Sequence, residues 1–175
     1  MKKSLLLAFL LLLCVSGCRG KATAEHSIQA DADESIAMNG ISFTFEKAEI
    51  CKEVKPKQPN GYYRYYEEKK GYSYYVISGT AENKGLHVLD AGNIKVQGIS
   101  GRKTYEGALL FSNHDKSDLV TEIGTNDELE FSFVILMKEG RPQPDRLEIY
   151  YTKDLKAPQE GEPYDESIIW TLPSS

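Results

Sequence analysis

Tyrosine is the residue type whose spacing in this sequence most strongly suggests binding chemistry. Seven of the 11 tyrosines fall between positions 62 and 75. The first group is Tyr62, Tyr63, Tyr65 and Tyr66. Residues 67–71, ending in Gly71, predict a hairpin loop between this group and a strand that starts at Tyr72. An exposed row of phenol rings suits stacking on sugars or contact with a protein, whereas an ordinary hairpin of aromatic residues explains the same pattern.

A second candidate for chemistry is Cys18, which follows a short apolar leader. Lys2 and Lys3 give the leader a positive start, residues 5–13 are apolar, and small residues precede the cysteine. The apolar run is shorter than the roughly 20 residues of a transmembrane helix, so we expect it to be cleaved. The junction resembles the lipobox of bacterial lipoproteins, which implies a lipid on the Cys18 thiol and a mature chain held on the extracytoplasmic face of the cell membrane. An ordinary secretory signal with an incidental cysteine is the alternative.

Metal and cofactor sites are not expected from the remaining polar residues. Asn113, Asp115 and Asp118 lie close together, and oxygen ligands at alternating positions can hold calcium, but the run lacks the central glycine and the distal glutamate of a calcium loop. A polar turn explains it better. The sequence has three histidines, His26, His87 and His114. Because His26 lies in the predicted tether, we expect no three-histidine metal site.

Catalytic motifs are also missing from the printed sequence. It has no Gly-x-Ser-x-Gly elbow, no phosphate-binding glycine loop and no metal-spaced cysteine pair after the leader. We therefore predict that the protein is not an enzyme and has no catalytic residues. A cell-envelope hydrolase that uses surface carboxylates is kept as the least favoured alternative.

Charge and cysteine content narrow the partners further. The formal net charge of −5 becomes −7 once the leader and its two lysines are removed, which argues against a nucleic-acid partner. Once Cys14 is removed with the leader and Cys18 carries lipid, Cys51 is the one free thiol, so it cannot form an intrachain disulfide. It is then either a small packed side chain or a reactive thiol. Three lysines follow Cys51 closely, at positions 52, 55 and 57. Either they keep a surface loop solvated, or Lys52, Lys55 and Lys57 contact an anionic wall polymer.

The chain divides into three predicted parts. Residues 1–17 form the signal peptide, and residues 18–37 form a lipidated start and a disordered tether with few apolar groups. Residues 38–175 form one domain, which Asn39 and Gly40 introduce with a turn.

Alternation of apolar and polar residues predicts that this domain is all-β. The pattern has period 2 over residues 41–46, 129–137 and 147–151, and residues 72–81 are aromatic and β-branched. Shorter strands are expected around residues 94–96, 105–111 and 168–172. Short strands with turn signals between them indicate an antiparallel sandwich or barrel.

A family resemblance refines this prediction. The strand 74–82 runs into Asn83, Lys84 and Gly85, and the Gly124 turn leads into residues 129–137. This order resembles immunoglobulin-like domains of unknown function in Gram-positive lipoproteins, a group similar in fold to a secreted immunoprotective antigen. The resemblance implies an immunoglobulin-like β-sandwich at the cell surface and transfers no site residue.

Together these features favour a membrane-anchored extracytoplasmic module that binds a protein or a cell-wall glycan. The tyrosines at 62, 63, 65 and 66 are its candidate ligand-binding residues. An accessory structural lipoprotein of a membrane complex is the alternative function.

Overall fold

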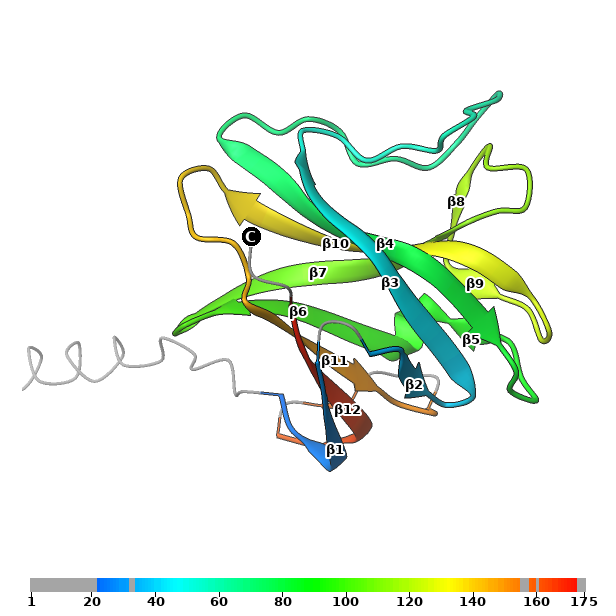
Figure 1. The fold of residues 1–175 in the computed structure, drawn as a ribbon, viewed down its shortest axis with the longest axis vertical. Helices are drawn as coiled ribbons and strands as arrows, with labels where there is room; N and C mark the ends of the chain where they lie inside the picture. Colours follow the sequence, from blue (N-terminus) through cyan, green and yellow to red (C-terminus); the bar gives the residue numbers. More distant parts are fainter. Residues whose placement is uncertain (1–21, 32–33, 155–157, 160, 173–175) are drawn as a thin grey trace, which may run out of the picture.

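Twelve strands and one short 3-10 helix make up the regular structure of the described residues, which are 22–31, 34–154, 158–159 and 161–172 of the computed structural model (Figure 1). In chain order the elements are β1 (Ala24–Ala30), β2 (Ile36–Met38), β3 (Ile41–Cys51), β4 (Tyr72–Asn83), β5 (Leu89–Asp90), η1 (Ala91–Asn93), β6 (Ile94–Ser100), β7 (Lys103–Ser112), β8 (Leu119–Val120), β9 (Glu122–Ile123), β10 (Glu128–Lys138), β11 (Arg146–Tyr151) and β12 (Tyr164–Thr171). Within this part of the chain no helix is long and apolar enough to cross a membrane. Cys18 and the predicted leader lie outside the described residues.

Main-chain pairing joins most strands into one continuous sheet, in the order β1-β12-β11-β6-β7-β10-β4-β3-β2, with β8 added to β7. A separate pair is formed by β5 and β9. The long sheet folds over, so that β2 at one end contacts β12 near the other. In Figure 1, β3, β4 and β10 occupy the upper part of the molecule, and β11, β12 and β1 the lower part. The predicted all-β sandwich is confirmed, and its immunoglobulin-like subtype stays a prediction.

The main core lies between the two layers, where aromatic rings from distant strands meet. Phe43 of β3 packs edge-on against Phe131 of β10, with ring centroids 5.2 Å apart. Trp170 of β12 is fully buried and contacts Phe45 and Phe133 at 5.9 and 6.4 Å. Because Trp170 comes from the layer opposite Phe45 and Phe133, its contacts with these two rings help to close the sandwich.

The predicted disordered tether was wrong over residues 24–30 and 36–38, which form β1 and β2. The side chains of β1 are mostly exposed, so its composition resembles a tether. Its main chain pairs with β12 in parallel, with Ile28 opposite Ile168, and main-chain hydrogen bonds do not depend on side-chain type. This pairing is parallel, whereas the other strand pairings of the described residues are antiparallel, as predicted.

The Asn39-Gly40 turn also has a different place from the one expected. It joins β2 to β3 as a two-residue hairpin turn, because Met38 pairs with Ile41. Both turn residues have positive φ, 48° for Asn39 and 79° for Gly40, as a turn of this kind requires. The folded part therefore begins before residue 38.

Candidate functional site

The predicted tyrosine hairpin is not formed. The strand β4 already has a partner on each edge, since Cys51 of β3 pairs with Tyr74 and Lys138 of β10 pairs with Tyr72. No edge of β4 is left for residues 62–66. These residues belong instead to a long connection, residues 52–71, which we call the tyrosine loop. Gly71, at the end of this loop, has a positive φ of 76°.

The base of the tyrosine loop packs on the outer face of the sheet. Val54 and Tyr66 form an isolated antiparallel bridge, and the ring of Tyr66 lies edge-on to Tyr74 with centroids 5.8 Å apart. Val54 belongs to a second apolar cluster, separate from the main core, and Tyr66 packs against this cluster. It consists of Val54, Tyr74, Val76, Leu110, Leu119 and Val134. Tyr66 is therefore half-buried and serves packing.

The other three tyrosines lie at the tip of the loop. Tyr62 is fully exposed, Tyr65 is 46% exposed and Tyr63 is half-buried. The rings of Tyr63 and Tyr65 are tilted against each other with centroids 5.6 Å apart. Tyr65 donates its hydroxyl to Glu67 at 2.8 Å, and this bond raises the pKa of the phenol. The tip of the loop thus exposes both aromatic rings and phenol hydroxyls to solvent.

Bonds to the β7–β8 connection hold the tip in place. Asp118 accepts a hydrogen bond from the main-chain N–H of Arg64 at 2.6 Å. The carbonyl of Lys116 accepts one from Gln58 at 2.9 Å. Lys57 pairs with Glu130 of β10 at 2.6 Å. A loop fixed in this way loses less conformational entropy when it binds.

The run Asn113 to Asp118 is a polar turn, in which the acidic side chains accept main-chain hydrogen bonds. Asp115 accepts from Ser117 at 3.0 Å, and Asp118 accepts from Leu119 at 2.8 Å. Hydrogen bonds from Ser117 lower the pKa of Asp115. Among the described residues, no three His, Cys, Asp or Glu side chains are grouped so as to hold a metal ion.

Cys51 lies at the edge of the second cluster and is half-buried. Its thiol is 3.9 Å from the carbonyl oxygen of Tyr74. Burial raises the pKa of the thiol, and Glu49 and Glu53 raise it further. These surroundings fit the packing role, because a raised pKa keeps the reactive thiolate scarce.

The sequence analysis missed a groove of about 510 Å³ at the end of the sandwich away from the loop tip. The pairing of β7 with β10 ends at Gly107 and Ile135, so residues 103–106 and 136–138 diverge and the groove opens between them. Tyr72, Tyr105 and Leu136 line it, with Lys103, Lys138, Arg141 and Glu106 beside them. We call it the basic groove. The sequence feature that relates to this groove is Gly107, where a Cβ would collide with Ile135.

Comparison with known proteins identifies the fold and no function. No family model and no curated protein matches the chain. An uncharacterised β-sandwich protein from Clostridium difficile is similar over 87% of this chain and 100% of its own, with 14% identity and a TM-score of 0.55. A candidate lipoprotein from Bacillus subtilis aligns with 81% of this chain and 38% of its own, with 10% identity and a TM-score of 0.42. The first similarity supports a β-sandwich.

Proposed function

We propose that the chain is a membrane-anchored extracytoplasmic lipoprotein that works as a binding module, and that it has no catalytic activity. The lipobox-like junction at Cys18 supports the anchor. The exposed tyrosines of the loop tip support binding, and they are the observation on which the proposal rests.

The loop tip suits a cell-wall glycan or an exported protein. Flat rings cover the apolar faces of a sugar or a side chain, while the phenol hydroxyls of Tyr62, Tyr63 and Tyr65 supply hydrogen bonds. Tyrosine has few rotatable bonds, so its ordering costs little. The bonds that hold Arg64 and Gln58 keep the tip ready for contact.

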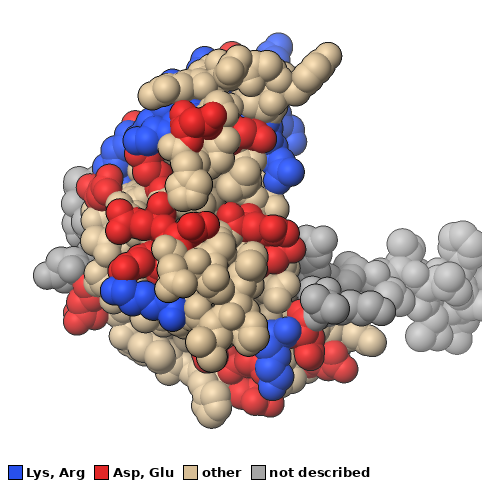
Figure 2. Space-filling model, turned by 90° about the vertical axis from the view of Figure 1, so that its right-hand side faces the viewer, with Lys and Arg blue, Asp and Glu red and all other residues tan. Residues whose placement is uncertain are grey.

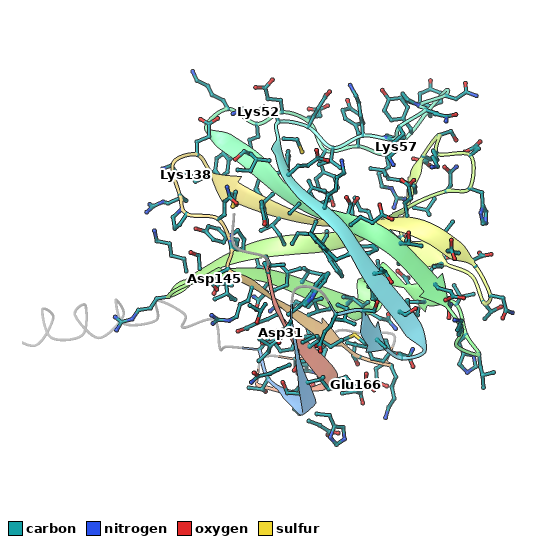
Figure 3. All side chains as sticks on the ribbon, in the orientation of Figure 1. Asp31, Lys52, Lys57, Lys138, Asp145 and Glu166 are labelled. Carbon is teal, nitrogen blue, oxygen red and sulfur yellow. The ribbon has the colours of Figure 1, made fainter. Side chains whose placement is uncertain are left out.

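The place of the tip in the fold also supports a role in recognition. In Figure 3 the loop runs from Lys52 at one end of the sandwich toward Lys57 at the other. Figure 2 looks at this second end and shows uncharged side chains at the top with basic side chains on both sides of them, above a band of acidic side chains. Aromatic surface flanked by charges of both signs gives an anionic ligand little net attraction, which favours an uncharged ligand.

The binding test uses the mature full chain with wall glycan fragments and with native membrane extracts after crosslinking. The double change Tyr62→Ser with Tyr65→Ser is expected to weaken binding by about tenfold or more, as loss of aromatic anchors does. Leu86 and Val88 are 89% and 56% exposed on another loop, so their change to serine is the matched control. Unchanged binding by the tyrosine variant would rule out the loop tip, and a partner found only by crosslinking would favour the accessory role in a complex.

The anchor is tested separately by mass spectrometry of the native protein. The expected species begins at Cys18 and carries lipid on it. An intact leader or an unmodified cysteine would exclude the anchor and leave the loop-tip result unaffected.

A further inference from the structure

Three basic side chains that have no ion-pair partner among the described residues line the basic groove. Eight described Lys and Arg residues have a described carboxylate within 4.0 Å: Lys47, Lys52, Lys55, Lys57, Lys84, Lys116, Arg146 and Lys153. Lys103, Lys138 and Arg141, which line the groove, have none. Lys69 lies over the ring of Tyr72 at 4.5 Å, and Arg102 directly precedes Lys103. Arg64 in the tyrosine loop, Lys70 and Lys95 on β6 also have no carboxylate within 4.0 Å among the described residues, but the groove is where three such cations line one cavity.

This pattern bears on one of the two alternatives that the sequence left open for the lysines of the tyrosine loop. Lys52, Lys55 and Lys57 were the lysines considered for an anionic wall polymer. In the structure each has a carboxylate partner: Lys52 pairs with Glu139, Lys55 with Glu53 and Lys57 with Glu130. A paired lysine attracts an anion less, so the basic groove is the better place for a negatively charged ligand.

The walls of the groove add apolar surface to the free cations. Tyr72 and Tyr105 are both half-buried, and Tyr105 is held by a hydrogen bond of 2.9 Å from its hydroxyl to the carbonyl of Pro142. Leu136 completes the wall from β10. Rings and an aliphatic side chain next to cations fit a ligand in which an anionic group is joined to a less polar part.

Arg141 favours phosphate as the anionic group. The planar guanidinium matches two phosphate oxygens at once, and lysine ammonium groups bind the same group as point charges. Glu106 is the one acid on the groove wall, so positive charge prevails. The formal charge of the whole chain is −5, which makes this local surplus a specific feature of the groove.

We infer that the basic groove is a binding site for a phosphodiester, with the phosphate between Lys103, Lys138 and Arg141 and the organic part against Tyr72 and Tyr105. The site is independent of the loop tip and of the lipid anchor. Its ligand is a polyol-phosphate polymer or the headgroup of an anionic phospholipid, which share this chemistry. In Figure 3, Lys138 marks the groove end, opposite the end marked by Lys57.

The test measures binding of the mature full chain to poly(glycerol phosphate) and to phosphatidylglycerol vesicles. The triple change Lys103→Gln, Lys138→Gln and Arg141→Gln is expected to weaken binding at least about tenfold, since hydrogen bonds to charged groups are lost. Raised salt is expected to weaken the parent too. The matched control changes Lys47, Lys84 and Lys153 to Gln, which removes equal charge elsewhere. Trp170 fluorescence checks that each variant is folded.

The arms of the experiment separate the two sources of phosphodiester. Binding to the soluble polymer alone identifies a wall-type ligand, and binding to vesicles alone identifies a lipid headgroup; both support the site. Arg141→Lys keeps the positive charge but removes the planar guanidinium that contacts two phosphate oxygens. We therefore expect it to weaken binding less than the triple change does. Absence of binding to both probes, equal loss in the control triple, or equally tight binding of polygalacturonate would each overturn the assignment.

Discussion

Val54 and Tyr66 exchange two main-chain hydrogen bonds, of 3.0 Å from the Val54 N–H and 2.8 Å from the Tyr66 N–H. This bridge divides the tyrosine loop into a base that packs on the sheet and a tip that faces solvent. The side chains on the two sides of the bridge therefore have different roles. Tyr66 contacts Tyr74, whereas Tyr62 is fully exposed.

The first prediction separates these roles by stability. We expect Tyr66→Ala to lower the free energy of unfolding by about 1–2 kcal/mol, because it removes packing on the second cluster. The matched change Tyr62→Ala is expected to alter it by less than about 0.5 kcal/mol. Urea unfolding followed by the fluorescence of Trp170, the one tryptophan, measures both. Equal costs would contradict the division of the loop.

The second prediction concerns Gly79, which lies opposite Phe45 at a register shift in the β3–β4 pairing. A Cβ at this position would collide with the carbonyl oxygen of Thr44. We expect Gly79→Ala to cost roughly 3 kcal/mol, because the strands must move apart to admit it. Gly101 has a φ of 57° and open space around it, so Gly101→Ala should cost only about 1 kcal/mol. A cheaper change at Gly79 than at Gly101 would refute this explanation.

The alternation of apolar and polar residues predicted the central strands, because every second side chain of these strands is buried in the core and must be apolar. In β10, Phe131, Phe133 and Ile135 face the main core, and their period of 2 is visible in the sequence. The strand β1 has no such signal, since only its main chain is used in pairing. An edge strand that is held by main-chain hydrogen bonds and has exposed side chains therefore has the same amino-acid composition as a disordered tether.

The two candidate sites depend on pairings that local sequence does not encode. The aromatic residues on both sides of Gly71 favour a hairpin, but β3 and β10 take both edges of β4. The basic groove arises where β7 and β10 separate after Gly107 and Ile135. Its lining comes from four segments of the chain, so no single motif could have indicated it.

The third prediction is a pH dependence that arises from Glu130. Burial raises the pKa of this carboxyl, but hydrogen bonds from Lys116 and Lys57 outweigh it, so the pKa lies below its ordinary value of 4.5. A lowered folded-state pKa stabilises the protein above pH 4.5, and this contribution is lost as pH falls through the folded value. We expect Glu130→Gln to flatten the loss of stability between neutral pH and acid. Glu128→Gln, which removes the same charge from the same strand, is the control.

The fourth prediction concerns Cys51 in a mature chain that carries Cys18→Ser, where it is the single thiol. Because burial and nearby glutamates raise its pKa, little thiolate is present near neutral pH. We expect alkylation at least roughly tenfold slower than that of glutathione, and recovery of the rate in denaturant. The pH profile of the rate, measured with a neutral maleimide, provides the check. A fast reaction in the folded state would indicate a functional thiol.

The last prediction concerns Asn83, whose side chain is fully buried where β4 ends. Its amide group donates to the carbonyls of His87 and Ile123 at 3.0 and 3.1 Å, and its oxygen accepts from the N–H of Gly85 at 2.9 Å. One side chain thus joins the end of β4, the turn after it and the strand β9. The sequence marks this position only as a turn.

Loss of these bonds should be costly because their partners stay buried. We expect Asn83→Ala to lower the free energy of unfolding by roughly 3 kcal/mol, as unsatisfied buried groups do. Asn83→Asp places a carboxyl against two carbonyl oxygens, so it should be destabilising at neutral pH and partly rescued in acid, where the protonated group can donate. Asn60→Ala, at an exposed position, should be neutral. Urea titrations at two pH values test all three, and a neutral effect of Asn83→Ala would show that the turn holds without its amide.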